Sequence, residues 1–526
     1  MKRSGKLILN ASLYTLPVIC SMPHNLLLKL INMTQQFHSL VNNLHQPSVL
    51  VIGDLILDTY LRGASTRLTP EAPVPVVNIT SHTCVPGGAA NTAINLRYLG
   101  AAVTFAAIVG EDTAGKEAQA LLSKEGIHTY LINCNSRNTI VKTRVIAGSQ
   151  LLTRYDEGTE IPVPDGCEEK LIAFLEDTFD HYDAIVIADY NKGVVTPGII
   201  TALERLNAER KKFIAVDAKR LDLYRQLRPS LVKPNYHEIM QLLQLPEKSS
   251  YRAAQLRDMG GAISRLTGAE VVALTLDAEG ALIFNKGEIV CHTPAYPVSQ
   301  LNVSGAGDTY ISAFTMSCLS GMELCDAAEM AAAAAAIVIN KDDTAYCARG
   351  ELIAFFSMHN KYLDSTAQLK EVCAVYKAQG KRIVFTNGCF DILHSGHVSY
   401  LTRARELGDI LIVGINNDES IKRLKGSTRP INQLQDRMEV LGGLGAVNHI
   451  IAFGKPGDDT PIELIRTIAP DVFTKGGDYT REGLPEAEVV EELGGVVTIL
   501  PVVPDRSTTS LIRRIHTSPV LKVAQG

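Results

Sequence analysis

The sequence lacks an excess of positive charge and any sign of paired cysteines. Its 51 Lys and Arg residues are outnumbered by 56 Asp and Glu residues, so the formal net charge is −5. No overall basic field therefore favours binding to nucleic acid or to an anionic membrane. The ten cysteines are scattered, without a Cys-x-x-Cys motif or disulfide-like spacing. This distribution is typical of a protein of the reducing cytoplasm, which is the location we expect.

Long apolar runs are also missing. No segment after the N-terminal region contains about 20 unbroken apolar residues, the length needed to cross a bilayer. Near the N-terminus, three basic residues precede a mixed apolar stretch, 7–20, which loosely resembles a signal peptide. Polar residues and Pro17 interrupt this stretch, so we interpret residues 1–32 as a poorly ordered extension or the result of a misassigned start codon. Met22 and Met33 are alternative starts.

The chain of 526 residues is too long for one ordinary domain, and its hydrophobic content of 46% is typical of globular proteins. The pattern predicts a first domain over residues 33–355 and a second over 366–518. A short polar linker, 356–365, joins them, and residues 519–526 form a tail.

The first domain alternates between apolar runs and helical periodicity. Strands are predicted at 49–54, 103–109, 184–189, 213–217 and 271–276. Helices are predicted at 33–44, 114–125, 168–177, 197–209 and 253–267. Such alternation predicts an α/β fold, with a parallel sheet covered by helices on both faces. Residues 73–79 alternate in polarity but contain two prolines, which favours an edge strand in a small lid sheet. An exposed lid edge can pair between subunits, so a homodimer is a further hypothesis.

A glycine-rich loop followed by an apolar segment, 311–319, is the first candidate for chemistry. Gly305, Ala306 and Gly307 let successive backbone N–H groups turn toward one point, where a helix N-terminus adds partial positive charge. This arrangement suits a phosphoryl group in transfer. Asp308 follows directly and is placed to take a proton from a hydroxyl nucleophile. The alternative is a plain turn before a core helix.

Two further segments place polar groups where ligands gather in α/β sheets. Asp54 and Asp58 follow a buried strand and are predicted to hold sugar hydroxyls. Their alternatives are a helix N-cap and a solvated turn. The loop 87–88 is small enough for close approach of a ligand, and Asn91 can both donate and accept hydrogen bonds. By itself this loop could also be a helix cap.

Charged residues follow other strands of the first domain. Lys142, Arg144 and Arg154 form a basic cluster near the predicted lid, and Asp189 ends a core strand. A sugar that already carries a phosphate needs such cations, so these residues are predicted to bind the substrate. Solvated surface charge is the alternative.

These motifs together resemble those of the ribokinase-type sugar kinases. The loop with Asp308 is similar to the family's C-terminal signature, and the loop 87–91 to its N-terminal signature. The resemblance implies that Asp308 is the general base, that residues 305–307 form an anion hole and that Mg²⁺ accompanies ATP. Residues 233–238 match the family's Asn-x-x-Glu element, and 275–280 resemble its nucleotide loop. The implied ATP-binding residues are Asn235, Tyr236, His237, Glu238, Thr275 and Gly280.

Residues 70–77, the Gly-Gly-Ala-Ala-Asn loop and Lys-Pro-Asn-x-x-Glu look like the heptose 7-phosphate kinase branch of that family. One feature departs from the signature of the sugar kinases and two depart from the pattern of this branch. Asn302 stands where Asp is usual, residues 217–220 replace Asp-Pro-Lys-Gly, and Asp342 replaces a Gly near the adenine pocket. The first and last of these departures leave open a sensor or scaffold that binds sugar phosphates without turnover.

The second domain begins with a strand, a glycine-containing turn and a polar helix start over residues 381–397. His394 and His397 flank Gly396, so both rings can face a phosphate at the helix N-terminus. A turn with a metal-binding or idle histidine pair is the alternative. Two histidines alone do not complete a zinc site, and no further Cys or His has suitable spacing. We therefore predict no metal bound by a protein ligand cluster alone.

The whole segment resembles the cytidylyltransferase-like nucleotidyltransferases, a Rossmann-like α/β family whose histidines bind the triphosphate in the transition state. For residues 507–509, a hydroxyl N-cap is the structural alternative and is compatible with a phosphate contact. The resemblance implies these nucleotide- and phosphate-binding residues: Thr386, Asn387, Gly388, Phe390, Asp391, Lys425, Arg429, Lys475, Gly476, Asp478, Ser507, Thr508 and Thr509.

The order of the two domains resembles that of the bifunctional enzymes of ADP-heptose synthesis for the lipopolysaccharide core. The resemblance implies phosphorylation of D-glycero-β-D-manno-heptose 7-phosphate at O1 by ATP, then adenylyl transfer from ATP to heptose 1-phosphate. A separate phosphatase is implied between the steps. The alternative is a generic sugar kinase fused to another nucleotidyltransferase.

Overall fold

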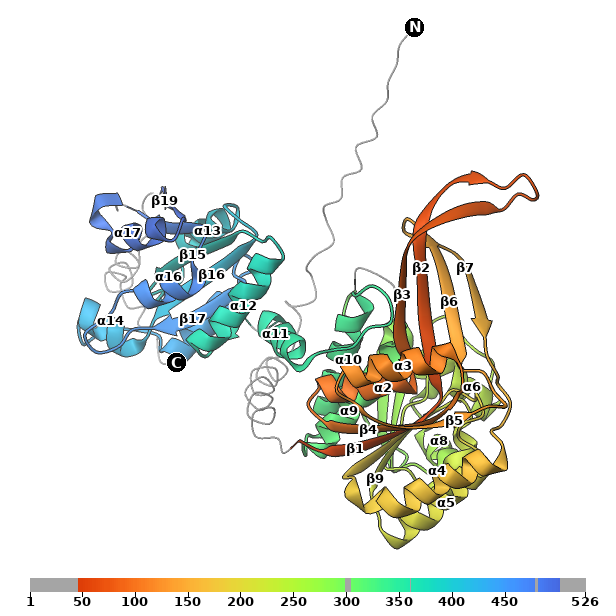
Figure 1. Ribbon diagram of the computed structural model, residues 1–526. Helices are drawn as coiled ribbons and strands as arrows, with labels where there is room; N and C mark the ends of the chain where they lie inside the picture. The colour runs from red at the N-terminus through yellow and green to blue at the C-terminus, as the bar shows by residue number, and fades with distance from the viewer. Residues whose placement is uncertain (1–45, 299–303, 360, 478–480, 502–526) are drawn as a thin grey trace, which may run out of the picture. The chain divides into compact units, whose positions relative to one another are not determined.

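A computed structural model describes residues 46–298, 304–359, 361–477 and 481–501. The chain divides into two compact units between Phe355 and Phe356, and each is described separately below (Figure 1). The helix predicted at 33–44 lies outside the described residues. Among the helices in the described ranges, none is both long and apolar enough to cross a membrane.

A large sheet forms the centre of the N-terminal unit. In the described residues it has nine strands in the order β13-β12-β11-β10-β9-β8-β1-β4-β5. Only β12 and β13 run antiparallel to their neighbours. The strands are β1 (Ser48–Gly53), β4 (Ala102–Gly110), β5 (His128–Cys134), β8 (Ala184–Asp189), β9 (Phe213–Ala218), β10 (Leu231–Val232), β11 (Val271–Thr275), β12 (Ala281–Asn285) and β13 (Glu288–Thr293).

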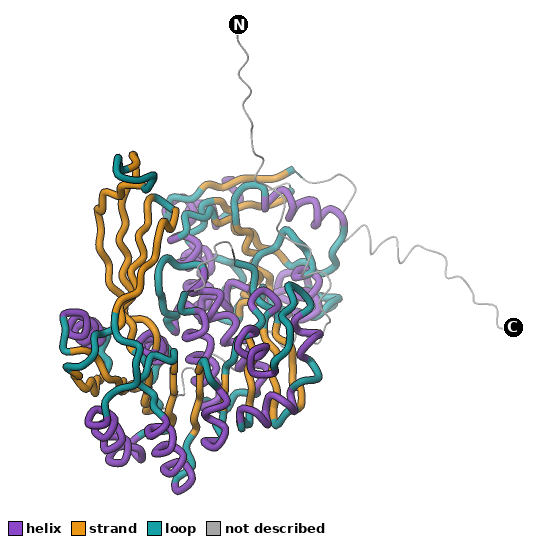
Figure 2. The backbone as a smooth tube through the Cα atoms, turned by 90° about the vertical axis from the view of Figure 1, so that its right-hand side faces the viewer, coloured by secondary structure: helices purple, strands orange, loops and turns teal. Residues whose placement is uncertain are grey.

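Helices cover both faces of this sheet, as predicted for the α/β fold (Figures 1 and 2). The apolar side chains of β1, such as Leu50 and Ile52, are fully buried in one core with Leu171 and Leu203 of the covering helices. The helices and short 3₁₀ turns are α2 (Ala89–Tyr98), α3 (Thr113–Lys124), α4 (Asp165–Thr178), η2 (Phe179–His181), α5 (Pro197–Glu209), η3 (Leu221–Leu227), α6 (Tyr236–Leu243), α7 (Arg252–Leu256), α8 (Gly260–Thr267), η4 (Asp277–Glu279), α9 (Ala306–Leu319), α10 (Leu324–Ile339) and α11 (Arg349–His359).

The strand order changes direction at β1. From β1 the chain leads to β4 and β5 on one side, whereas β8 to β11 lie on the other. Open α/β sheets bind ligands at the carboxyl end of the strand where the order reverses. The end of β1, at Gly53, is therefore the expected place for a site.

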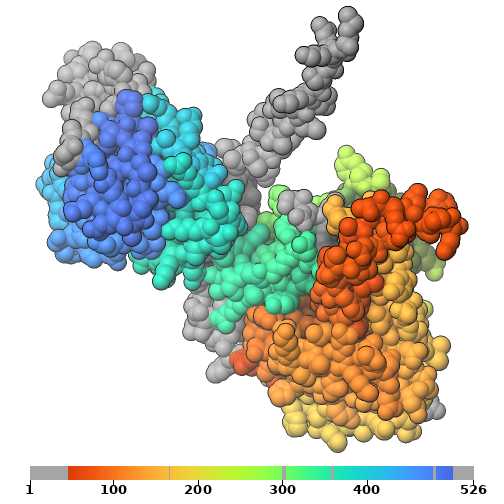
Figure 3. All heavy atoms as spheres, turned by 45° about the horizontal axis from the view of Figure 1, so that its top comes forward, coloured from red at the N-terminus to blue at the C-terminus, as the bar shows by residue number. Residues whose placement is uncertain are grey.

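The lid sheet starts at that same point. Within the described residues its strands are β2 (Leu55–Leu68), β3 (Pro75–Gly88), β6 (Ile140–Ala147) and β7 (Gln150–Glu157), in the order β3-β2-β6-β7. The predicted edge position of residues 73–79 is confirmed, because β2 is the one strand in the described ranges that pairs with β3. The long strands β2 and β3 project from the body of the unit (Figures 1 and 3).

The C-terminal unit contains a second, wholly parallel sheet. In the described residues its order is β14-β17-β16-β15-β18-β19, which reverses direction at β15. This is the Rossmann-like arrangement predicted, and the carboxyl end of β15 is the expected site. The strands are β14 (Tyr362–Leu363), β15 (Ile383–Gly388), β16 (Ile410–Asn416), β17 (His449–Phe453), β18 (Val472–Gly476) and β19 (Val496–Leu500). The helices are α12 (Thr366–Ala378), α13 (Ser395–Arg405), α14 (Asp418–Lys425), α15 (Leu434–Gly442), α16 (Ile462–Ile468), η5 (Arg481–Gly483) and α17 (Pro485–Glu492).

Two segments differ from the prediction. The single helix predicted at 253–267 is split into α7 and α8, with Gly260 at the start of α8. A Cβ on Gly260 would lie 2.3 Å from the Gly287 carbonyl oxygen, so only glycine allows this close packing. The segment predicted as a linker, 356–365, contains the end of α11 and strand β14. Tyr362 and Leu363 are buried and pair with β17, because an apolar pair can extend the neighbouring sheet.

Candidate active sites

Asp308 lies at the centre of the first site. It is buried in the first turn of α9, which begins after Gly305 in the left-handed conformation, with φ 81°. Three side chains from distant segments donate to its carboxylate. Asn91 Nδ2 lies 3.0 Å from Oδ2, Thr92 Oγ1 lies 3.3 Å from Oδ1, and the Tyr190 hydroxyl also donates to Oδ1. The fold thus brings the predicted Asn91 and the predicted base together.

The electrostatics of Asp308 suit proton abstraction. Burial raises the pKa of this carboxyl above its ordinary value, although the hydrogen bonds from Tyr190 and Asn91 and the charge of Lys233 oppose the shift. A carboxylate with a raised pKa is a stronger base than a solvated one, provided that it stays ionised at the working pH.

Lys233 beside the glycine loop was missed by sequence reasoning. It follows β10, is buried, and its Nζ lies 3.1 Å from Asp217 Oδ2. A Cβ on Gly307 would lie 3.2 Å from the same Nζ, so the ammonium group faces the predicted anion hole. Burial raises the pKa of Asp217 to about 6 despite the nearby lysine. The sequence could have indicated Lys233, because it is the first residue of the motif that contains the predicted ATP-binding residues Asn235 and Glu238.

Two carboxylates predicted to bind sugar accept hydrogen bonds from the protein's own groups. Asp54 accepts hydrogen bonds from the N–H groups of Tyr190, Lys192 and Val194 at 2.9–3.1 Å. Asp189 accepts from the Asn191 N–H at 2.8 Å and from the Tyr224 hydroxyl at 2.7 Å. Burial and the charge of Asp189 raise the pKa of Asp54 to about 6. Both carboxylates therefore shape the loop after β8.

Asp58 lies at the base of the lid in a buried polar network. Its Oδ1 lies 2.7 Å from Arg144 Nη1, and its Oδ2 accepts from Thr344 Oγ1 at 2.9 Å. A Cβ on Gly87 would lie 2.1 Å from Asp58 Oδ2, and Gly88 has φ 58°. Both glycines are thus needed for this close approach of β2 and β3.

The three predicted cations differ in their surroundings. Arg144 pairs with Asp58, and Arg154 pairs with Asp156 on the exposed strand β7. In the described part of the chain, Lys142 forms no ion pair, and its Nζ lies 6.0 Å from the ring centroid of Tyr190. Burial lowers the pKa of Lys142. Of the three, only Lys142 lacks a carboxylate partner within the described residues.

The predicted ATP-binding residues only partly converge. Asn235 and Glu238 form a capping box at the start of α6, with bonds of 2.8 and 2.9 Å. The Tyr236 hydroxyl is used internally, since it donates to Gln255 Oε1 at 2.7 Å, and the exposed His237 pairs with Glu247. These two side chains have contacts away from the glycine loop.

The predicted nucleotide loop and the unusual loop 341–344 have structural partners. Thr275 lies beside Asn235 and donates its backbone N–H to the Pro234 carbonyl at 3.0 Å. Gly280 has φ 84°, a conformation that favours glycine. Asp342 is exposed, whereas its neighbour Asp343 pairs with Arg62 of the lid.

The second site lies at the carboxyl ends of β15 and β18. The Thr386 Oγ1 lies 2.7 Å from the Tyr400 hydroxyl, which donates to the Thr474 carbonyl at 2.9 Å. This contact ties α13 to both strands. Two buried oxygens, Asn387 Oδ1 and Thr474 Oγ1, have no partner among the described residues. These buried, unpaired oxygens lie where the strand order reverses, and a ligand can supply the hydrogen bonds that they lack. Gly388 ends β15, directly before Cys389.

The two histidines stand together at the start of α13. Their ring centroids are 3.9 Å apart, and His397 Nδ1 accepts from the His394 backbone N–H at 3.4 Å. Burial, followed by the charges of His394 and Lys425, lowers the pKa of His397 to about 4. His397 is therefore neutral near pH 7 and carries its proton on Nε2. Phe390, with φ 45°, contacts the His397 ring edge-on.

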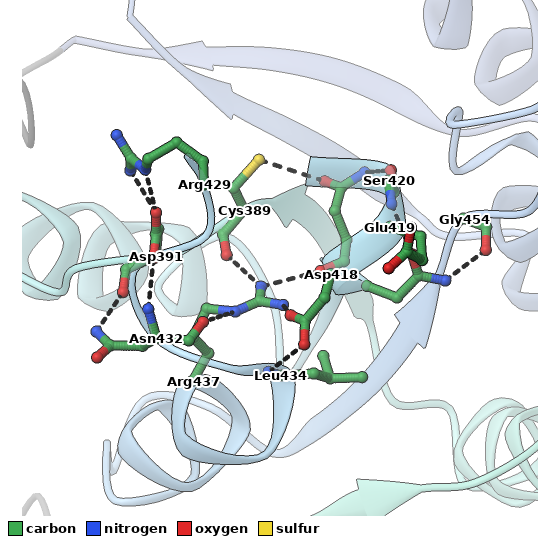
Figure 4. A network of polar contacts seen from close by, with 12 residues as sticks. Cys389, Asp391, Asp418, Glu419, Ser420, Arg429, Asn432, Leu434, Arg437 and Gly454 are labelled. Carbon is green, nitrogen blue, oxygen red and sulfur yellow. Dashed lines mark hydrogen bonds and ion pairs between the residues drawn. The ribbon is translucent and has the colours of Figure 1, made fainter. Parts of the chain in front are cut away.

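Asp391 and Arg429, both predicted to contact the nucleotide, pair with each other. Asp391 Oδ1 also accepts from the backbone N–H groups of Ile431 and Asn432 at 2.8 and 3.0 Å. The buried Asp391 thus anchors the loop after α14 (Figure 4).

Lys475 and Lys425 have opposite environments. Lys475 Nζ lies 3.7 Å from Glu486 Oε1, and burial lowers the pKa of this lysine. Lys425 is exposed at the end of α14. A Cβ on Gly476 would lie 3.0 Å from the Tyr400 ring, which explains glycine at the end of β18.

Arg437 of α15 was not predicted from the sequence. It contacts the backbone at the carboxyl ends of β15 and β16. Its side chain is fully buried, and its Nη1 donates to the carbonyls of Cys389 and Asn416 at 2.7 and 2.9 Å. It also pairs with Asp418 at 2.7 Å (Figure 4). No sequence motif distinguished Arg437 from a solvated helix residue.

Five selected residues lie outside the described ranges: Asn302, Asp478, Ser507, Thr508 and Thr509. Within the described ranges, no group of three His, Cys, Asp or Glu side chains is arranged to hold a metal ion.

Comparisons with known proteins match both units. Residues 46–349 match the pfkB family carbohydrate kinase model, and residues 385–516 match the cytidylyltransferase-like model. The bifunctional protein HldE of Pelobacter propionicus is 36% identical over 91% of this chain and 98% of its own length. That of Helicobacter pylori is 38% identical over 89% and 98%, respectively. Phosphofructokinase-2 from Escherichia coli, in complex with potassium, shares the fold of the first unit. Its identity is 18% and its TM-score 0.50, covering 60% of this chain and 99% of that one.

Proposed function

The chain belongs to the family of bifunctional HldE proteins, with a pfkB-type carbohydrate kinase unit and a cytidylyltransferase-like unit, and we propose that it catalyses two steps of ADP-heptose synthesis. The kinase unit transfers the γ-phosphoryl group of ATP to O1 of D-glycero-β-D-manno-heptose 7-phosphate. The second unit joins AMP from ATP to heptose 1-phosphate and releases pyrophosphate. The observation that carries this proposal is the similarity to HldE proteins across both units.

In the kinase unit, Asp308 takes the proton of the anomeric hydroxyl as its oxygen attacks the γ-phosphorus. The glycine loop at Gly305 and the N-terminus of α9 receive the negative charge of the moving group. Lys233 adds positive charge beside Gly307, and Asp217 fixes its position. Lys142 is available for the phosphate already present on the sugar.

The side chains beside the glycine loop fit a magnesium ion carried by ATP. Mg²⁺ is usually held by one or two carboxylates together with substrate phosphates. Asp217 and Glu238 would supply these carboxylates, because Asp217 lies near Gly307 and Glu238 contributes to the electrostatics of Asp217. When bound, the ion would neutralise negative charge on the phosphates of ATP.

In the second unit, the sugar phosphate itself is the nucleophile, so no protein nucleophile is needed. An oxygen of heptose 1-phosphate attacks the α-phosphorus of ATP, and pyrophosphate leaves. His397 donates a hydrogen bond from Nε2 to the triphosphate, and Lys475 contributes positive charge at the end of β18. Asn387 supplies a buried oxygen without a partner in the described residues.

We also propose three properties of the whole enzyme. The product of the first unit keeps its 7-phosphate, so a separate phosphatase acts between the steps. The open edge of β3 supports a homodimer. The cytoplasm is the location we propose, since nine described cysteines are all free thiols and ATP is abundant there.

The experiment that tests this function separates the two sites. Asp308→Asn is expected to lower kinase turnover by about 10²–10⁴, the usual contribution of a general base, and to leave adenylyl transfer unchanged. His397→Ala is expected to do the reverse. Each reaction is assayed alone, with heptose 7-phosphate or heptose 1-phosphate as acceptor.

The two variants serve as controls for each other, because each must retain the activity of the unaltered unit. Loss of both activities from either folded variant would contradict two independent sites. Heptose phosphate binding without ATP turnover in the unaltered chain would instead favour a sugar-phosphate sensor, and turnover of unrelated sugars would favour a generic kinase.

A further inference from the structure

Tyr190 contacts the proposed base, yet no motif assigned it a role. It is the first residue after β8, and its hydroxyl donates to Asp308 Oδ1. Burial raises the pKa of Tyr190 well above its ordinary value, so the hydroxyl keeps its proton and acts as a donor. The contact joins the loop after β8 to the first turn of α9.

The hydrogen bonds of Asp308 distinguish its two oxygens. Each carboxylate oxygen offers about two lone-pair sites. Oδ1 receives the Tyr190 hydroxyl and, at 3.3 Å, the Thr92 hydroxyl. Among the described residues, Oδ2 receives only Asn91 Nδ2, at 3.0 Å. One site on Oδ2 is thus left for a further hydrogen atom.

We propose that Tyr190 is a positioning residue that occupies Oδ1 of Asp308 together with Thr92, so that Oδ2 takes the proton of the sugar hydroxyl. This inference rests on the proposed function of Asp308 as the general base. Donation to the charged form of a carboxylate also favours its ionised state, which a base requires.

The loop that carries Tyr190 is held by buried carboxylates. Asp54 accepts from three of its backbone N–H groups, including that of Tyr190 itself at 2.9 Å. The next residue, Asn191, has φ 57° and is held by Asp189 at 2.8 Å. Backbone hydrogen bonds of this kind fix the direction of the Tyr190 side chain. This gives Asp54 and Asp189, at the ends of two strands, a structural role.

Other charges around the pair act in known directions. Lys233 lowers the pKa of Asp308, while Asp308 and Asp217 raise that of Tyr190. Asp58 of β2 also raises the pKa of Tyr190, and Lys142 of β6 lies 6.0 Å from its ring centroid. Removal of the Tyr190 hydroxyl leaves all these charges in place, so its effect on Asp308 can be isolated.

The test is the pH dependence of kinase kcat/KM in Tyr190→Phe, measured on the full chain with heptose 7-phosphate and MgATP. Loss of the largest opposing hydrogen bond is expected to raise the pKa of Asp308, so the acid limb of the profile moves to higher pH. On the acid side, kcat/KM is expected to fall by about tenfold or more relative to the unaltered chain. The deficit narrows at high pH.

Tyr98→Phe is the matched control, because the Tyr98 hydroxyl of α2 also donates to a carboxylate, Glu125 Oε2, at 2.7 Å. Its acid limb is expected to stay in place even if its melting temperature falls. An unchanged limb in Tyr190→Phe, or a loss that is equal at every pH, would overturn the proposal. Should Tyr190→Phe not fold, Thr92→Val removes the other Oδ1 donor, and an unmoved limb there would overturn it equally.

Failure of this inference is distinguishable from failure of the proposed function. If Asp308→Asn abolishes kinase activity while Tyr190→Phe keeps the original profile, only the role of Tyr190 is wrong. If Asp308→Asn remains fully active, the base itself is wrongly assigned.

Discussion

At the scale of single residues, His397 shows how local packing sets a protonation state. The ring lies against His394 and Phe390 at the start of α13, and its Nδ1 accepts a backbone N–H. Burial opposes a charge on the ring, and the charges of His394 and Lys425 add to this effect, so the pKa of His397 falls to about 4. The folded chain therefore holds a neutral imidazole over the whole physiological range.

This protonation state predicts a specific loss of stability in acid. The unfolded chain binds a proton at His397 with a pKa of about 6.5, whereas the folded chain does so only near 4. Stability contributed by the neutral ring is thus complete above pH about 6.5 and is lost as the pH falls toward 4. His397→Gln is expected to lose less melting temperature between pH 7 and pH 5 than the unaltered chain does. Calorimetry of the full chain measures the difference.

The control for that experiment is His128→Gln, which removes an exposed histidine from β5. It is expected to follow the unaltered chain at each pH. Equal acid sensitivity of the His397→Gln variant and the unaltered chain would show that His397 titrates normally.

Residue types could be predicted better than residue roles. A carboxylate after a buried strand can bind a ligand or hold its own loop, and both uses require the same sequence pattern. Asp308 faces the proposed site, but Asp54 and Asp391 accept backbone N–H groups. Lys233 and Arg437 escaped prediction because their burial depends on contacts distant in sequence.

At the scale of elements, the strands and helices that could be predicted were those with a regular pattern of apolar residues. Apolar runs located the core strands, and two prolines identified the edge strand β3. The break between α7 and α8 was not predictable from periodicity, because it depends on packing of Gly260 against Gly287. Strand β14 was missed because only two residues form it.

The edge of β3 gives the proposed dimer a test. Ile79 of β3 and Leu151 of β7 are 40% and 53% exposed, on opposite edges of the lid sheet. Ile79→Glu is expected to weaken the dimer at least about tenfold, because a charge on a pairing edge disfavours association. Sedimentation equilibrium measures the dissociation constant.

Leu151→Glu is the matched control and is expected to leave the dissociation constant unchanged. The opposite pattern would assign the interface to β7. If the unaltered chain is a monomer in solution, the proposed dimer is wrong.

At the scale of the whole molecule, each unit has its own sheet, its own core and its own switch point. β1 and β15 each end at the reversal of strand order, and each end carries a candidate site. A fold with two such reversals can hold two ATP-dependent reactions without sharing residues between them. The sequence order of motifs was sufficient to predict this organisation, because each motif lies within one unit.

Phosphorus NMR of the unaltered chain shows directly whether each unit catalyses its proposed reaction. With heptose 7-phosphate, ATP and Mg²⁺, we expect ADP and a heptose 1,7-bisphosphate, at which the reaction stops. With heptose 1-phosphate in place of the 7-phosphate, we expect an ADP-sugar and pyrophosphate. A first sample without the bisphosphate, beside an active second sample, would contradict a working kinase unit, and a silent second sample would contradict the adenylyltransferase.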